Sequence, residues 1–484
     1  MPGCILVHSA GISDLTRERT ITKKNRIFLS GALVLSLAFL WWGVRVSKRP
    51  KFSVQLRGDG IALSIAGTGD WLTRDAITRE RADRSFAGIS EIVKNASLGL
   101  TTLEEDLLDK ESASTRGGSE SPRWPHGTKR DAESLRRCGF TVVSLANNHA
   151  ADYGIEGMRQ TGEILDHEGI PHVGSGEDLQ HANGQVYVGS KPIRVAVIAA
   201  TTSAEPQSRA TYTQGEILGR PGVNVLRYSP KVTVDPSTFA TLKRSGIAVH
   251  SNASDPDQLI LSGTVINKGS KTIVEFLANE QDRDGILAQI KNARSNADVV
   301  VLMLHSHEPG DRSETPAEFV QRFARASIDA GASLVVGDGP HRLRGIESYR
   351  GGVIFYSLGN FVFESGGIDP SAADQYDRGT DLYELALGSL GDSQTQSAPK
   401  AEEAVWWESV IATTSFEHGV VNSIQLQPID LGVNLPLAQR GTPRLADPLL
   451  GGEILRRLVR LSPALGAAMR VENGTGFVDF SQNR

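Results

Sequence analysis

From Ile61 onward, short apolar runs alternate with polar helical stretches, and each apolar run is followed by a turn rich in Gly or Asn. Runs of Val, Ile and Leu without polar alternation are typical of strands that are buried on both faces. The pattern therefore predicts an α/β fold of two packed sheets, covered on their outer sides by helices. The expected strands are Ile61–Gly67, Phe140–Ala146, Ile193–Thr201, Val299–His305, Ser333–Gly337 and Gly352–Gly359.

The segments between and after these strands complete the expected organisation. Glu318–Asp329 has apolar residues at helical spacing and is expected to be a helix, as is the stretch near Ile454–Leu461. Asp109–Pro122 and Ile368–Glu403 are polar and are expected to be flexible loops. We expect one domain over residues 61–430, and a tail element over 431–484 that packs on it.

The N-terminal part predicts a membrane anchor. Residues 1–26 form a polar tail, residues 27–44 carry no charge, and residues 45–60 form a basic linker. As a helix, the uncharged run spans about 27 Å, close to the roughly 30 Å hydrocarbon core of a bilayer. Its length and the bulky Trp41 and Trp42 favour an uncleaved signal anchor over a cleaved signal peptide or a buried core helix. Basic residues on both sides leave its orientation open.

Composition narrows the chemistry that the domain can perform. The net charge of −5 argues against a nucleic-acid-binding surface over the whole protein. The two cysteines, Cys4 and Cys138, are too few for a disulfide framework or a zinc ribbon. No phosphate-binding loop, dinucleotide fingerprint or serine-hydrolase elbow follows a predicted strand. Metal chemistry would therefore have to use His, Asp, Glu and Asn.

Side chains of these types gather where the predicted strands end. In open α/β sheets, ligands bind outside the carboxyl ends of the strands. Carboxylate, amide and imidazole groups suit divalent ions, a pair of which can activate water on a phosphate, while a spare histidine can protonate the leaving oxygen. Taken singly, Asp70, Asn147, His307 and Asn360 could each be an ordinary turn or loop residue. The strand-end residues are Asp70, Asn147, Asn148, His149, His305, His307, Glu308, Asp338, His341 and Asn360.

Three longer motifs read GTGDWLTRD, SLANNHAADYGIEGMRQT and SIDAGASLVVGDGPHRLRGIESYRGGVIFYSLGNFVFE. Together they resemble the CapA family of poly-γ-glutamate capsule synthesis proteins, within the calcineurin-like metallophosphatase superfamily. The resemblance runs from about Ile61 to about Asp430. It implies a four-layer α-β-β-α metallophosphatase-like sandwich after one transmembrane helix, with the main domain outside the cell.

The resemblance also assigns roles by position. It implies a site for two divalent ions (Mn, Zn, Fe or Mg), with His149 as the general acid. The implied metal ligands are Asp70, Glu104, Asn148, His305, Asp338 and His341. Asn147, His307, Glu308 and Asn360 would surround them.

Three positions depart from the superfamily or family pattern. Leu72 stands where the superfamily has a histidine, and this departure is common in the family. Thr102 stands in place of an asparagine and Asp338 in place of a histidine, and both departures are particular to this chain. An additional carboxylate favours harder ions such as Mn or Mg.

The function expected is that of a membrane-anchored capsule synthesis protein with a metal-dependent, hydrolase-like site. It would support the synthesis or export of poly-γ-glutamate or a related polymer. Its expected partners are the membrane and the polymer or its synthase and export complex, and no nucleic acid. We expect a single-pass protein of the cell membrane with an extracytoplasmic main domain. The alternatives are a non-catalytic partner of the polymer or synthase, and a general metallophosphoesterase.

Overall fold

The computed structural model describes most of the chain from residue 55 onward, and residues from Phe52 to Arg484 form one compact unit. The described ranges are 55–56, 63–73, 86–109, 126–190, 193–247, 250–251, 255–262, 264–363, 404–435, 440–462 and 469–480. The expected anchor, 27–44, and most of the two expected flexible loops lie outside these ranges. Among the described helices, none is long and apolar enough to cross a membrane.

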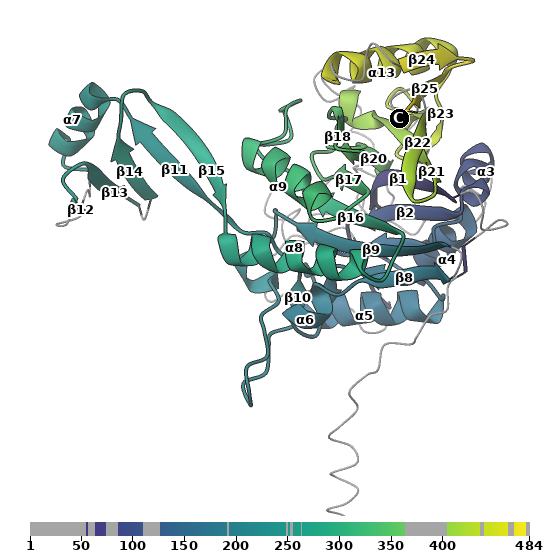
Figure 1. Cartoon of the computed structure of the whole chain (residues 1–484), viewed down its shortest axis with the longest axis horizontal. Coiled ribbons are helices and arrows are strands. Elements are labelled where there is room, and N and C mark those ends of the chain that lie inside the picture. The colour runs from purple at the N-terminus through teal and green to yellow at the C-terminus, as the bar shows by residue number, and fades with distance from the viewer. Residues whose placement is uncertain are drawn as a thin grey trace, which may run out of the picture. The chain divides into compact units, whose positions relative to one another are not determined.

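The largest sheet in the described part of the chain has ten strands (Figure 1). Its parallel half has the order β1-β2-β5-β6, and β1 is also paired with β20 in parallel and with β21 in antiparallel fashion. The strands are β1 (Leu63–Leu72), β2 (Leu98–Leu103), β5 (Val142–Ser144), β6 (His172–Val173), β20 (Asn360–Phe363), β21 (Glu408–Glu417), β22 (Val420–Asp430), β23 (Arg444–Leu445), β24 (Met469–Glu472) and β25 (Thr475–Asp479).

A second described sheet has six strands in the order β18-β19-β17-β16-β9-β8. Its four inner strands are parallel, so their carboxyl ends meet at one edge. The strands are β8 (Val186–Ser190), β9 (Ile193–Thr201), β16 (Val299–His305), β17 (Leu334–Asp338), β18 (Ile346–Tyr349) and β19 (Gly352–Phe355).

The two sheets pack face to face through a shared apolar core. Ile65 and Leu100 of the first sheet belong to the same buried cluster as Val197 and Met303 of the second. The outer face of the first sheet packs on α3 (Ala87–Asn95) and α4 (Lys129–Cys138), and that of the second on α8 (Glu280–Arg294) and α9 (Glu318–Asp329). The prediction of a mixed α/β fold is confirmed, and its core has two large packed sheets, as expected, rather than a single open one.

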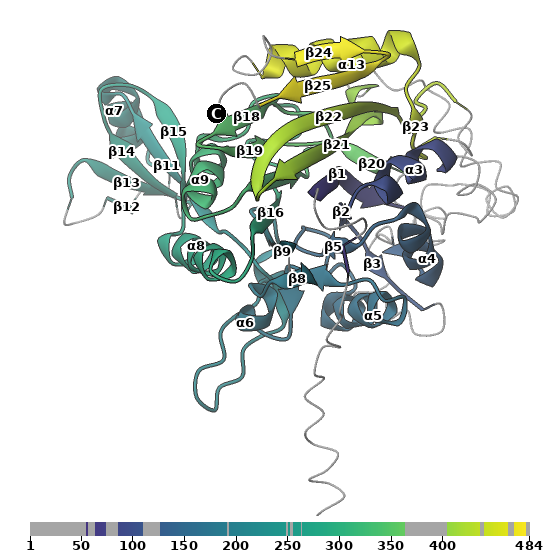
Figure 2. The same ribbon diagram turned by 45° about the vertical axis from the view of Figure 1, so that its right-hand side comes forward.

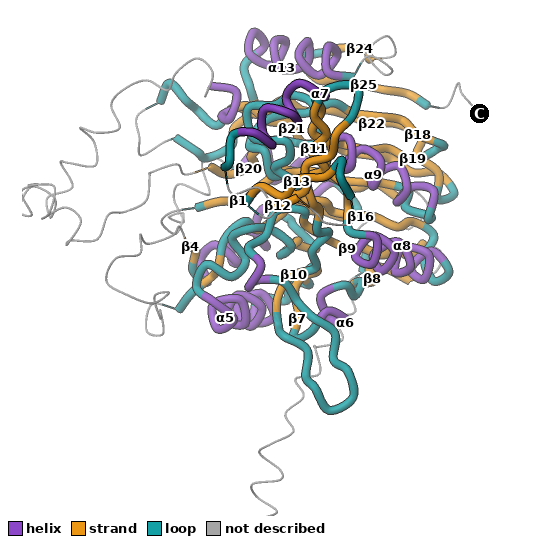
Figure 3. The backbone as a smooth tube through the Cα atoms, turned by 90° about the vertical axis from the view of Figure 1, so that its left-hand side faces the viewer, coloured by secondary structure: helices purple, strands orange, loops and turns teal. Residues whose placement is uncertain are grey.

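Further elements flank this core. Helix α5 (Gly154–His167) packs on the short pair β3 (Asp106–Leu107) and β4 (His126–Gly127), and α6 (Leu179–Ala182) lies by β7 (Ser175–Gly176) and β10 (Gly222–Val223). Helix α13 (Pro448–Leu461) runs along β22 and β25 (Figure 2). In Figure 3, helices α5, α8 and α13 lie outside the strands. Two short 3-10 turns cover Pro206–Ser208 and Ala404–Trp407.

A five-stranded sheet that the hydrophobic pattern did not reveal is inserted between β10 and α8. It comprises β11 (Tyr228–Val234), β12 (His250–Ser251), β13 (Gln258–Leu261), β14 (Thr264–Lys268) and β15 (Ile273–Ala278), with α7 (Pro236–Arg244). Val234, Phe239, Leu259 and Ile266 form its small buried core. Its strands are mostly half-exposed, so they lack the long apolar runs by which the buried strands were predicted.

Strand β1 is longer than predicted, and this difference positions the first site residue. The sequence suggested a strand that ended at Gly67, but β1 continues to Leu72 after a register shift between Gly67 and Asp70. The continuation pairs Asp70 with Asn360 of β20. It requires Gly69, because a Cβ atom there would lie 1.8 Å from the carbonyl oxygen of Gly359. Asp70 therefore lies within a paired strand rather than in a turn.

Candidate metal centre

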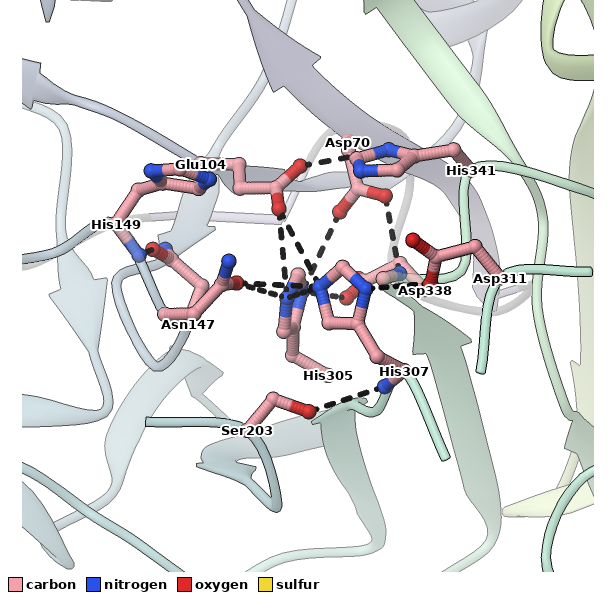
Figure 4. Close-up of polar contacts among 12 residues, drawn as sticks. Asp70, Glu104, Asn147, His149, Ser203, His305, His307, Asp311, Asp338 and His341 are labelled. Carbon is pink, nitrogen blue, oxygen red and sulfur yellow. Dashed lines mark hydrogen bonds and ion pairs between the residues drawn. The ribbon is translucent and has the colours of Figure 1, made fainter. Parts of the chain in front are cut away.

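The candidate centre lies where the carboxyl ends of the two large sheets meet. Asp70 comes from β1 and Glu104 directly follows β2, both in the first sheet. His305 and Asp338 end the neighbouring strands β16 and β17 of the second sheet, where they are paired in register. Asn148 and His341 come from the loops after β5 and β17. The six residues predicted as ligands thus lie close together, although they span much of the chain. Figure 4 shows five of them: Asp70, Glu104, His305, Asp338 and His341.

Glu104 lies at the middle of this group. Its side chain is fully buried, and among the described residues neither carboxylate oxygen accepts a hydrogen bond. One oxygen, Oε1, lies 3.5 Å from His305 Nε2 and 3.8 Å from His307 Nε2. The other, Oε2, lies 3.9 Å from His341 Nδ1. A buried carboxylate without hydrogen bonds is costly unless a cation balances it.

Asp70 and Asn148 each have a side-chain oxygen close to His305. Asp70 Oδ2 accepts a hydrogen bond from the backbone N–H of Gly339 at 3.0 Å. Asp70 Oδ1 accepts none among the described residues and lies 3.5 Å from His305 Nδ1. Asn148 Oδ1 lies 2.8 Å from His305 Nε2 and 3.3 Å from His307 Nε2. Both residues therefore direct oxygen atoms towards the histidines.

Four groups of three residues have ligand atoms within 4.8 Å of one another, which is close enough to share an ion. They are Glu104–His305–His307, His307–Asp311–His341, Asp70–His305–Asp338 and Asp70–Glu104–His341. Imidazole and carboxylate ligands suit Zn, Mn and Fe. The unpaired oxygens of Asp70 and Glu104 show that the site fits a divalent cation.

The charges of the group perturb several pKa values. Burial, together with the charges of Glu104 and Asp338, raises the pKa of Asp70 well above its usual value. Burial also acts to raise the pKa of Glu104, but the positive charges of His341 and His305 and a contact with His307 outweigh it and lower that pKa. Burial lowers the pKa of His341. The pKa values of the neighbouring carboxylates Asp70 and Glu104 are thus shifted in opposite directions, a pattern typical of functional sites.

The pKa values of His305, on β16, and of His307, in the following loop, are raised, whereas that of His341 is lowered. Burial acts to lower the pKa of both His305 and His307, but hydrogen bonds to carboxylates outweigh it. The pKa of His305 is raised well above its usual value, and that of His307 rises to about 9. The negative potential that holds these protons is the same potential that would attract a divalent cation.

His149 lies at the edge of the group (Figure 4). Its Nδ1 lies 2.7 Å from Asp152 Oδ2. Burial acts to lower the pKa of His149, but this hydrogen bond and the charge of Glu104 raise it above its usual value. The raised pKa favours the protonated form of the imidazole, which proton donation requires.

The four residues expected around the ligands have different surroundings. Asn147 is buried and fixes the turn, since it donates to the Leu103 carbonyl and accepts from the His149 N–H. Asn360 Oδ1 lies 2.9 Å from His341 Nδ1. Glu308 is directed away from the centre, towards the hydroxyls of Thr202, Ser203 and Ser306. His307 faces the ligand group directly.

Three residues that contact the centre or its loops were not predicted from the sequence. Asp311 binds His307 Nδ1 at 2.7 Å, and Asp152 binds His149. Arg344 is fully buried and donates to backbone carbonyls of the loop that carries His307 and Asp311. The spacing of Asp311 four residues after His307 was the available signal, but in a loop this spacing implies no contact.

Comparisons with known proteins agree with the motifs. The family described as "Bacterial capsule synthesis protein PGA_cap" matches residues 64–365, and the chain belongs to this family. It is 35% identical over 422 residues to the uncharacterized protein y4sH of Sinorhizobium fredii, covering 83% of this chain and 90% of that protein. It is 25% identical over 372 residues to "Capsule biosynthesis protein CapA" of Bacillus anthracis, covering 75% and 76%.

A second relative named CapA and one solved structure are also similar to this chain. The chain is 25% identical over 360 residues to "PGA biosynthesis protein CapA" of Bacillus subtilis, covering 73% of this chain and 76% of that protein. Among solved structures, a putative 5'-nucleotidase from Staphylococcus aureus, in complex with alpha-ketoglutarate, matches with a TM-score of 0.32 and 11% identity. That match covers 61% of this chain and 48% of the nucleotidase chain. Family membership, and with it a capsule-related role, therefore rests on the sequence matches.

Proposed function

We propose that this protein is a membrane-anchored capsule synthesis protein whose metal centre is a hydrolytic site acting in the synthesis or export of poly-γ-glutamate or a related polymer. Relatives named for capsule and PGA biosynthesis support the polymer. The apolar run at 27–44 supports a single-pass anchor, and the family resemblance supports a main domain outside the cell. Two face-to-face sheets with helices on their outer faces support a four-layer, metallophosphatase-like sandwich.

One observation carries the hydrolytic part of the proposal. Glu104 is fully buried among three histidines, and within the described residues both of its oxygens lack hydrogen bonds. A carboxylate in that state needs a cation. Asp70, Asn148, His305 and His341 are placed to hold divalent ions together with Glu104. When bound, such ions polarise a phosphoryl or carbonyl oxygen and lower the pKa of water.

The protein's own residues supply the proton transfer. In hydrolysis, a water oxygen bonds to the phosphorus or the acyl carbon, and the bond to the leaving oxygen or nitrogen breaks. His149, whose pKa is raised by the hydrogen bond to Asp152 and by the charge of Glu104, donates its Nε2 proton to that leaving atom. The proton that the water loses passes to solvent, from which His149 is protonated again. Asn147 keeps His149 in place by accepting the hydrogen bond of its backbone N–H.

The test compares metal content and turnover in the full-length chain. With Mn²⁺ present, His149→Ala should keep its metal but lower turnover by roughly 10²–10⁴-fold, on poly-γ-glutamate or on a nitrophenyl phosphate ester. His167→Ala is the matched control, because 88% of that side chain is exposed and it lies on α5. A wild type that binds metal but hydrolyses neither substrate would instead be a non-catalytic partner of the polymer or synthase. Activity on phosphate esters alone would favour a general metallophosphoesterase.

A further inference from the structure

Two aspartate–histidine pairs lie side by side in the metal centre. His305 Nδ1 lies 2.8 Å from Asp338 Oδ1, and His307 Nδ1 lies 2.7 Å from Asp311 Oδ1. An ionised carboxylate only accepts hydrogen bonds, so when a ring gives up one proton to bind a cation, the remaining proton stays on Nδ1 and Nε2 supplies the lone pair. A histidine that binds a metal usually donates its other ring N–H in this way. Both rings are therefore oriented as metal ligands through Nε2.

The two Nε2 atoms point at the same oxygens. They lie 3.2 Å apart, and Glu104 Oε1 lies 3.5 Å from the first and 3.8 Å from the second. Asn148 Oδ1 lies 2.8 Å from His305 Nε2 and 3.3 Å from His307 Nε2. Ligand atoms about 2.1 Å from one tetrahedral ion lie about 3.4 Å from one another. The mean of these five separations is close to that value, so the four atoms enclose a space of the right size for one ion.

Asp338, which the sequence suggested as a ligand, accepts a hydrogen bond at each of its two carboxylate oxygens. Its Oδ1 accepts from His305 Nδ1, and its Oδ2 accepts from the hydroxyl of Thr102. Thr102 and Asp338, which the family resemblance marks as departures in this chain, are in direct contact. Glu104, in contrast, accepts no hydrogen bond from the described residues at either oxygen. The lone pairs available for a cation are thus on Glu104 rather than on Asp338.

We propose that His307 is a direct ligand of one metal ion, in a tetrahedral set with Glu104 Oε1, Asn148 and His305, and that Asp338 is a positioning residue. Asp338 orients His305, and Asp311 orients His307. The histidine ligand missing at position 338 is thereby replaced in space by one from the loop after β16. This assignment rests on the proposed metal-dependent function, and it specifies which residues form one of its two ion positions.

The loop that carries His307 is held firmly enough for this role. Arg344 donates to the carbonyls of His307 and Glu308, at 3.1 and 2.8 Å. The backbone N–H of His307 donates to Ser203 Oγ at 3.1 Å. Since both ends of the residue are fixed and Asp311 fixes the ring, His307 Nε2 is held in the direction of Glu104.

The experiment titrates the full-length chain with Co²⁺ and follows stoichiometry by calorimetry and ligand geometry by visible absorption. His307→Gln should weaken one ion by more than about 100-fold and remove the absorption of a tetrahedral site, whereas Asp338→Asn and Asp311→Asn should weaken it by about 10–100-fold and keep that absorption. His167→Gln, an exposed substitution, should change neither. Circular dichroism establishes that each variant is folded.

A rescue experiment separates a ligand from a positioning residue. His307→Gly should regain the weakened ion when free imidazole is added, and Asp338→Gly should not. If His307→Gln binds Co²⁺ like the wild type, or if Asp338→Asn alone loses the ion, the assignment is overturned and Asp338 is the ligand. If the wild type takes up no Co²⁺, the proposed metal-dependent function fails, and this assignment fails with it.

Discussion

Replacing Arg344 tests whether one buried side chain holds the loop of the metal centre. The side chain of Arg344 is fully buried, and its guanidinium donates to the carbonyls of Ser306, His307, Glu308, Gly310 and Ser313. In Arg344→Met, a side chain of similar length fills the space but donates nothing. The carbonyls would then be left without this donor, in a place that water does not easily reach.

The magnitude follows from the strongest of these hydrogen bonds. The two shortest, to Glu308 at 2.8 Å and to His307 at 3.1 Å, are expected to dominate. Each buried carbonyl left without a donor costs about 1–3 kcal/mol, so the two together cost about 2–6 kcal/mol. Removing a buried charge recovers part of this. We therefore expect Arg344→Met to lower the free energy of unfolding by about 2–5 kcal/mol.

Urea unfolding followed by circular dichroism, in the absence of metal, measures this change. The matched control is Arg322→Met on α9, where the guanidinium is half-exposed and bonds only to Glu318. That surface pair should contribute at most about 0.5 kcal/mol. Arg344→Lys should fall between the wild type and Arg344→Met, because an ammonium reaches fewer of the carbonyls. If Arg344→Met stays within about 1 kcal/mol of the wild type, the loop is held by other contacts and the reasoning is wrong.

Three further predictions concern the rest of the molecule. Gly69→Ala should lower the free energy of unfolding by more than about 4 kcal/mol in urea titrations, because its Cβ would lie 1.8 Å from the Gly359 carbonyl oxygen. A smaller effect would show that β1 and β20 can move apart at little cost in free energy. Mn²⁺ at a hundred times its dissociation constant should stabilise the wild type by about 2.7 kcal/mol in thermal unfolding. Glu104→Gln should abolish this stabilisation. Equal stabilisation of both proteins would place the ion elsewhere. Burial raises the pKa of Cys138 to about 12. In the variant Cys4→Ser, the Cys138 thiol of the folded protein should therefore react with a disulfide reagent at pH 8 about 10³-fold more slowly than in urea, and the rate should rise with pH because the thiolate is the reactive form. Rapid labelling of the folded protein would contradict the burial.

Local patterns in the sequence determined the elements that are buried on both faces. Strands β9 and β16 and helix α9 have the predicted boundaries, because continuous apolar runs and helical spacing are properties of adjacent residues. The residue types at the strand ends also indicated metal chemistry, since few other arrangements collect His, Asp and Asn at one sheet edge. The family motifs could be identified for the same reason, because each is a run of consecutive residues.

Tertiary structure decided what each side chain does. Asp70 lies in a strand only because β20, far along the chain, pairs with it. Asp338 binds His305 because β16 and β17 are in register, and its second oxygen is taken by Thr102 from the other sheet. The five-stranded sheet was not predicted, since its half-exposed strands carry a weak pattern. Periodicity encodes which faces are buried, but the direction of a lone pair depends on partners that only folding brings into contact.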